Sequence, residues 1–199
     1  MTEAIASGFQ DPSLGAQQTF RAVLKAMSEP ARPVTIDGPE PPAPLLASTW
    51  ALALTLFDHN TPLWIDAGHQ NDATLASLRF HCGCPIVDAV SDGSFAIVAE
   101  PSLMPPLDSF NQGSLAYPDR AATIIIQGVS LNSGTAYSFR GPGIDNMVDL
   151  SLDGLSAEFW QSWEVNRVNF PSGVDVILAS GQTLVGLPRT VECRERDCR

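Results

Sequence analysis

The sequence predicts one α/β domain with a mixed sheet, and three observations lead to this fold class. The chain has 199 residues, 44% of them hydrophobic, which suits one domain with a substantial core. Helical and strand patterns alternate along the first half, which favours a largely parallel sheet with helices on its faces. Hairpin patterns in the second half add antiparallel strands. Residues 1–199 are therefore predicted to form a single domain, ending in a frayed, charged tail over 192–199.

The first helix is expected to run from residue 12 to about residue 29. Asp11 can cap its free amides, and Pro12 fits its first turn, where no amide donor is needed. Pro30 ends the helix because the residue before a proline avoids the α region. Apolar residues recur at helical spacing and give the helix one apolar face, formed by Leu14, Phe20, Val23, Leu24 and Met27.

The rest of the first half reads as further alternating elements. A run that is apolar nearly all round, residues 45–57, predicts a helix covered on several sides. Asn71 and Asp72 provide a cap for another helix that ends near residue 80. Strands are expected at residues 34–36, 62–65, 85–87 and 95–98, and a proline-punctuated connection at 39–44.

The second half is expected to contain two hairpins. Residues 123–126 and 136–139 flank a turn at 132–134, and residues 174–178 and 183–187 flank Ser180-Gly181. Two helices are also expected, a short one near residues 106–111 and a longer one carrying Phe159, Trp160 and Trp163. Two tryptophans three residues apart are typical of a helix that packs into the core, although aromatic residues are also frequent at subunit interfaces.

Charge and hydropathy exclude two classes of partner. The net charge of −11 and a pI near 4.5 argue against a general nucleic-acid surface, since a polyanion repels an acidic body that has no basic patch. The longest apolar stretch falls well short of the ~20 residues that cross a bilayer, and the N-terminus has no signal-peptide pattern. We therefore expect a cytoplasmic protein that binds neither nucleic acid nor membrane.

Cofactor and metal motifs are missing from the sequence. The chain has no phosphate-binding glycine loop, and its only lysine, Lys25, lies on the polar face of the first helix, where it does not suit Schiff-base chemistry. Cys82 and Cys84 are too close in sequence for a typical structural zinc site. We predict no cofactor, no metal and four free thiols, the other two being Cys193 and Cys198.

Three regions that carry arginine can each be interpreted in two ways. Arg21 stands four residues before Lys25 on one helix face, which indicates either an anion site or a solvated face. The segment from Arg140 through Gly141 to Gly143 could form an anion-binding backbone nest or simply end a strand. Arg189 follows the last strand and Asp175 begins the strand before it, so a structural ion pair is favoured over a catalytic one.

Several segments, taken in order, resemble the PhnH family, the H subunit of the bacterial carbon–phosphorus lyase core complex. The match spans nearly the whole chain, which makes it more specific than any single motif above. It departs from the family at Ala31, where glycine is common, and this suggests that the turn does not need a positive φ here. The matching segments are residues 20–30, 61–64, 78–81, 170–175 and 187–190.

The resemblance implies a fold, a set of partners and a reaction. The fold would be a three-layer α/β/α mixed sheet similar to the large domain of pyridoxal-phosphate-dependent transferases, without the cofactor lysine. The partners would be a second copy of the chain and the G, I and J subunits. In the implied reaction, methylphosphonate replaces adenine at the ribose C1′ of ATP, which gives ribose 1-methylphosphonate 5-triphosphate.

Two functions are compatible with these features. The first is an assembly subunit that has no catalysis on its own. The second is a subunit that binds a nucleotide or phosphonate, for which the sequence offers anion contacts and one proton carrier, His81. The candidate anion contacts are Arg21, Arg79, Arg140, Gly141, Gly143 and Arg189.

Overall fold

A computed structural model describes residues 5–196 and shows two sheets and four α-helices within that range. The helices are α1 (Pro12–Ser28), α2 (Ala47–Leu56), α3 (Asp72–His81) and α4 (Ala157–Val168). The strands are β1 (Val34–Thr35), β2 (Leu63–Ile65), β3 (Ile86–Val87), β4 (Phe95–Val98), β5 (Thr123–Ile126), β6 (Ser130–Arg140), β7 (Val148–Asp153), β8 (Asp175–Ser180), β9 (Thr183–Leu187) and β10 (Glu192–Glu195). Short 3₁₀ turns lie at Ala67–His69, Val90–Asp92, Pro101–Leu103, Leu107–Ser109 and Pro118–Arg120.

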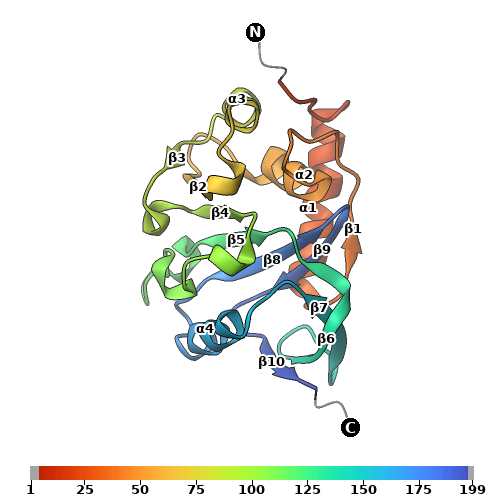
Figure 1. Cartoon of the computed structure of the whole chain (residues 1–199), viewed down its shortest axis with the longest axis vertical. Coiled ribbons are helices and arrows are strands. Elements are labelled where there is room, and N and C mark those ends of the chain that lie inside the picture. Colours follow the sequence, from red (N-terminus) through yellow and green to blue (C-terminus); the bar gives the residue numbers. More distant parts are fainter. Residues whose placement is uncertain (1–4, 197–199) are drawn as a thin grey trace.

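The larger sheet is mixed and confirms the predicted fold class. Its seven strands have the order β1-β9-β8-β5-β4-β2-β3, and β9 runs antiparallel to both of its neighbours, β1 and β8. The pairs β2/β3, β2/β4, β4/β5 and β5/β8 are parallel. The smaller sheet, β10-β6-β7, is antiparallel (Figure 1). The hairpin predicted around Ser180-Gly181 is therefore confirmed by β8 and β9.

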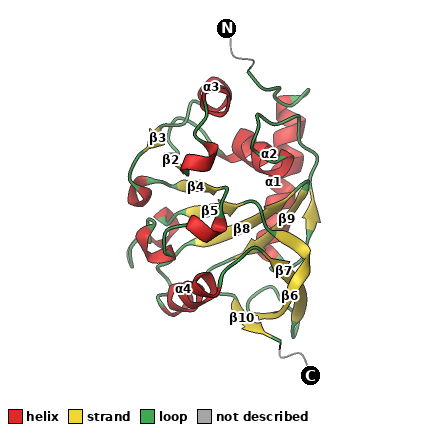
Figure 2. Cartoon of the chain, viewed as in Figure 1, coloured by secondary structure: helices red, strands yellow, loops and turns green. Residues whose placement is uncertain are grey.

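Both faces of the larger sheet are covered. Val23 of α1, Trp50 of α2 and Leu78 of α3 pack in one core cluster with inward residues of the strands, such as Ile125. On the opposite face, Trp163 of α4 joins the smaller sheet in a second cluster. Figure 2 shows the strands grouped between α1 and α2 on one side and α4 on the other. Helices thus lie on both faces, as predicted, but the second face also carries a small sheet.

The prediction that residues 123–126 and 136–139 pair in a hairpin is wrong. The first segment is β5, which lies parallel between β4 and β8, whereas the second lies in β6 and pairs with β7, a strand that the sequence did not suggest. The physical reason is burial: Ile124, Ile125 and Ile126 are fully buried on both faces, which is typical of a central parallel strand.

The tail prediction is also wrong within the described residues. Residues 192–195 form β10, an edge strand paired antiparallel with β6, while residues 197–199 lie outside the described range. Val191 is fully buried just before β10 and Cys193 packs against the core beneath it, so the backbone is held in place. Charged side chains are common on edge strands because they discourage further pairing.

Ala31 contradicts the expectation that its turn avoids a positive φ. Its φ is 60°, a left-handed conformation that costs an alanine about 1–2 kcal/mol. The residue is fully buried, and its N–H donates to the carbonyl oxygen of Gly186 at 3.1 Å. Burial of the methyl group and this hydrogen bond offset the strain.

The approach of α1 to β9 requires a glycine at position 186. A Cβ there would overlap the carbonyl group of Ala26, which belongs to α1. We expect Gly186→Ala to lower the free energy of unfolding by about 2–3 kcal/mol, because the helix must move away from the sheet. Gly83→Ala is the control, since a Cβ there meets no atom within 4 Å and costs only about 1 kcal/mol through its positive φ. If urea unfolding showed the same loss of free energy of unfolding for both variants, the close approach of α1 to β9 would be contradicted.

Candidate functional site

The predicted helix residues lie at separate places on the surface. Arg21 is exposed on α1, as is Lys25 four residues later, and Arg79 is exposed on α3. His81 is half-buried, and its Nε2 lies 2.8 Å from the carbonyl oxygen of Ala6. This hydrogen bond attaches the N-terminal segment to α3, so His81 has a structural contact.

Arg189 forms the structural ion pair that the sequence favoured. Its Nη2 lies 2.6 Å from Oδ2 of Asp175, and its Nε donates to Oδ1 at 3.1 Å. Its Nη1 donates to the carbonyl oxygens of Pro118 and Pro171, both at 3.1 Å. Because four of its five N–H groups already have acceptors within the chain, Arg189 serves mainly to join two loops to Asp175.

The segment of Arg140, Gly141 and Gly143 ends β6 and packs against α1. Both glycines have positive φ, and a Cβ at Gly143 would overlap the carbonyl oxygen of Ser28. Close packing therefore explains this glycine. Among residues 5–196, no hydrogen bond or ion pair joins this segment to Arg21, to α3 or to Arg189. The structure does not gather the seven candidate residues into one site.

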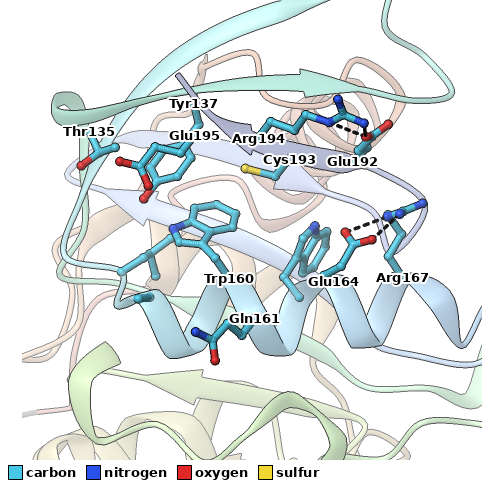
Figure 3. Close-up of a pocket in the computed structure, with 13 residues that line it drawn as sticks. Thr135, Tyr137, Trp160, Gln161, Glu164, Arg167, Glu192, Cys193, Arg194 and Glu195 are labelled. Atoms are coloured by element: carbon cyan, nitrogen blue, oxygen red, sulfur yellow. Dashed lines mark hydrogen bonds and ion pairs between the residues drawn. The ribbon is translucent and has the colours of Figure 1, made fainter. Parts of the chain in front are cut away.

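A large groove lies between α4 and the strands β6 and β10. Its volume is about 750 Å³. Figure 3 shows that α4 contributes one wall and β10 the other. The groove is lined by Thr135, Tyr137, Leu155, Ala157, Trp160, Gln161, Trp163, Glu164, Arg167, Glu192, Cys193, Arg194 and Glu195.

Ion pairs neutralise both arginines of the groove. Arg167 pairs with Glu164 on α4, and Arg194 pairs with Glu192 on β10 at 2.5 Å (Figure 3). Within residues 5–196, the carboxylate of Glu195 accepts no hydrogen bond and forms no ion pair. The groove therefore has an excess of negative charge, which does not suit a phosphate or a phosphonate.

Aromatic residues form the end of the groove near Glu195. Tyr137 and Glu195 are directly opposite each other on β6 and β10, so their side chains share one face of the small sheet. The ring of Trp160 packs on Tyr137 with 4.6 Å between centroids. Burial, together with the charge of Glu195, raises the pKa of Tyr137. The phenol is consequently neutral near pH 7.

The thiols are poor nucleophiles. Burial raises the pKa of Cys193 in the groove to about 12, with a smaller contribution from Glu164. Burial likewise raises the pKa of Cys82 to about 12, and it raises the pKa of Cys84. These three cysteines form no disulfide among the described residues, whereas Cys198 lies outside them. Residues 5–196 contain neither a cluster of metal-ligating side chains nor a helix fit to cross a membrane.

A buried polar junction, which the sequence analysis missed, lies at the carboxyl ends of β2, β4 and β5. Nδ1 of the fully buried His69 lies 2.8 Å from Oδ1 of Asp66, and its Nε2 lies 2.5 Å from Nε2 of Gln127. Because the amide nitrogen of Gln127 can only donate, His69 must accept at Nε2 and donate from Nδ1. The junction thus holds His69 in one neutral tautomer.

Backbone groups complete this junction. Oδ2 of Asp66 accepts from the N–H of Ala99 at 2.5 Å and from that of Glu100 at 3.3 Å. Burial raises the pKa of Asp66, but these bonds and the one from His69 outweigh it and leave the pKa below its usual value. Gln127 also accepts from the N–H of Leu46 at 3.1 Å. The polar residues directly after β2 and β5 were the signal that could have revealed the junction.

We expect Asp66→Asn to lower the free energy of unfolding by about 2 kcal/mol at pH 7, because an amide has one acceptor oxygen and cannot accept from both His69 and the backbone N–H groups as the carboxylate does. A lowered pKa stabilises the fold above the unfolded value of about 4, and this contribution disappears as the pH falls below it. The difference from the unsubstituted protein should therefore shrink between pH 6.5 and pH ~3.5 in urea unfolding. Asp37→Asn, at an exposed position, is the control. If Asp66→Asn lowered the free energy of unfolding by the same amount at both pH values, the charge of Asp66 would not be what stabilises the fold.

Comparisons with known proteins agree on one family. A family model described as bacterial phosphonate metabolism protein (PhnH) matches residues 7–194. The chain is 32% identical over 192 residues to the alpha-D-ribose 1-methylphosphonate 5-triphosphate synthase subunit PhnH of Rhizobium meliloti, with 96% of each chain covered. It is 30% identical over 178 residues to a putative C-P lyase subunit protein, HtxG, of Stutzerimonas stutzeri, with 87% of this chain and 83% of that protein covered.

Proposed function

Because this chain belongs to the PhnH family of bacterial phosphonate metabolism proteins, we propose that it is a subunit of the assembly that makes ribose 1-methylphosphonate 5-triphosphate. The observation that carries this proposal is the similarity to the synthase subunit over 96% of both chains. The similarity to a putative C-P lyase subunit supports the same process. In this proposal the reaction is the displacement of adenine from the ribose C1′ of ATP by methylphosphonate, in the cytoplasm.

Within that assembly we assign the chain an accessory role that has no turnover on its own. Its proposed partners are the G, I and J subunits and a second copy of itself. The groove supports this role because both of its arginines are already paired and the thiol of Cys193 is protonated at neutral pH. The family fold, similar to the large domain of pyridoxal-phosphate-dependent transferases without the cofactor, is part of the same proposal. The mixed sheet and the exposed position of Lys25 are compatible with it.

An exposed apolar patch supports an assembly role. We group into it five side chains that are 52% to 79% exposed, from α4 and the loops beside its C-terminal end: Leu115, Tyr117, Val165, Val168 and Phe170. Arg189 holds the loops together through the carbonyl oxygens of Pro118 and Pro171, which directly follow the two aromatic residues. Large contiguous apolar patches on soluble proteins commonly mark contact surfaces. We assign this patch to a partner subunit.

One observation favours a second candidate function. Arg21, Arg79 and Arg140 are exposed and have no carboxylate partner among the described residues, so they could contact an anion together with residues of other subunits. Titration of the isolated chain with ATP and with methylphosphonate in a calorimeter tests this function. Heat of binding at millimolar ligand would favour it, whereas heats equal to dilution would exclude a site within the chain itself.

The main proposal is tested by coexpression with the G, I and J subunits of the same organism. We expect a tag on this chain to recover all three, with native mass spectrometry giving the stoichiometry. Omitting this chain should then reduce the release of adenine from ATP and methylphosphonate. Elution of the chain without the other subunits would contradict the proposal.

The apolar patch makes a separate prediction. Val168→Lys places a charge at a position that is 70% exposed, so the fold should tolerate it while an apolar contact should not. We expect recovery of at least one partner subunit to fall about tenfold. Leu103→Lys, at an 81% exposed position outside the patch, is the matched control. Equal recovery with both variants would show that the patch is not a contact surface.

A further inference from the structure

We propose that the groove between α4 and β10 receives a positively charged side chain, arginine or lysine, from a partner protein. The inference rests on the proposed function in that the partner is another subunit of the assembly. It concerns a different surface from the apolar patch, because the groove lies between α4 and the small sheet. Three features support it: an unpaired carboxylate, an aromatic wall, and a charge balance that rejects anions.

Glu195 provides the carboxylate. It is exposed at the end of β10, lines the groove, and has no cationic partner among residues 5–196. The other two carboxylates of the groove belong to Glu164 and Glu192, and each already faces an arginine. An incoming guanidinium or ammonium group would therefore pair with Glu195 without displacing an existing ion pair.

Trp160 provides the aromatic wall beside that carboxylate. Its indole packs on Tyr137, the cross-strand neighbour of Glu195, and Figure 3 shows these three side chains gathered at one end of the groove. A tryptophan ring attracts cations through its quadrupole, and an adjacent carboxylate adds a charge-assisted hydrogen bond. The same ring would pack on the aliphatic part of a lysine or arginine side chain.

Charge also decides which occupant fits. Three carboxylates against two paired guanidinium groups give the groove a negative balance, and the whole chain carries −11. A nucleotide or phosphonate would be repelled, whereas a basic segment of a protein would be attracted from a distance. The occupant is therefore a basic surface of another subunit.

The test uses two variants that change the net charge equally. Glu195→Lys reverses the charge in the groove, and Glu158→Lys reverses it at an exposed position of α4 outside the groove. After coexpression with the G, I and J subunits, we expect Glu195→Lys to weaken binding of at least one subunit by tenfold or more and Glu158→Lys to leave it unchanged. Glu195→Gln should show a smaller loss. Trp160→Leu should weaken binding, and Trp160→Phe should restore part of it.

Two outcomes separate this inference from the proposed function. If the unsubstituted chain assembles and Glu195→Lys assembles as well as Glu158→Lys, the groove inference is overturned and the proposed function stands. If the unsubstituted chain captures no subunit, the proposed function fails. In that case a second measurement, made on this chain alone, tests whether the groove binds a cationic side chain.

That second measurement is an NMR titration of the full chain with N-acetyl-arginine amide, with the citrulline amide as the uncharged control. The indole N–H resonance of Trp160, assigned by its loss in Trp160→Phe, is the reporter. A shift with the arginine compound alone supports a pocket for a cationic side chain, and no shift at millimolar concentration overturns it. Binding of the free compound, combined with assembly that is insensitive to Glu195→Lys, would assign the groove to a small cation and overturn docking.

Discussion

The rest of the structure depends on the burial of β5 on both faces. Ile124 and Ile126 face one core cluster and Ile125 faces the other, so each face of the sheet must be covered. On one face, α1, α2 and α3 provide the cover. On the other face, the chain makes the smaller sheet and α4 from its second half. The surfaces assigned to function belong to these covering elements.

Because α4 helps to cover the second face of the larger sheet, the two proposed contact surfaces lie on and beside this helix. One side of the helix faces β10 and lines the groove, and its C-terminal end carries the apolar patch with the neighbouring loops. The pair Asp175–Arg189 stabilises this region because the same guanidinium binds a carboxylate at the start of β8 and two loop carbonyls. A residue that suggested an anion site in the sequence thus organises a contact surface in the fold.

The opposite end of the sheet is organised differently. Asp66, His69 and Gln127 connect the carboxyl ends of three strands; His69 and Gln127 are buried and Asp66 is partly exposed. In open α/β sheets this edge is the common place for ligands. Here, hydrogen bonds that are satisfied within the chain occupy it. A closed edge at this position and open surfaces around α4 agree with a subunit whose role is contact with other proteins.

Local sequence patterns were enough to predict those elements that depend on residues close together in the chain. Asp11 and Pro12 begin α1 as expected, the apolar run gives the buried α2, and Gly181 turns the hairpin of β8 and β9. Pairing between distant strands could not be predicted in the same way, because a short run such as 123–126 carries no information about its neighbours. The same holds for β10, whose charged residues resemble a tail until β6 provides backbone partners.

The sequence by itself determined the family, the fold class and the acidic charge, and it favoured a structural pair of Asp175 with Arg189. These follow from residue types and from order along the chain. Only the tertiary structure decided that the candidate arginines lie apart, that Glu195 and Trp160 line the same groove, and that His69 is held between Asp66 and Gln127. Apart from the Asp66–His69 contact, these juxtapositions join residues tens of positions apart, and they depend on the order of strands in the sheets rather than on any local pattern.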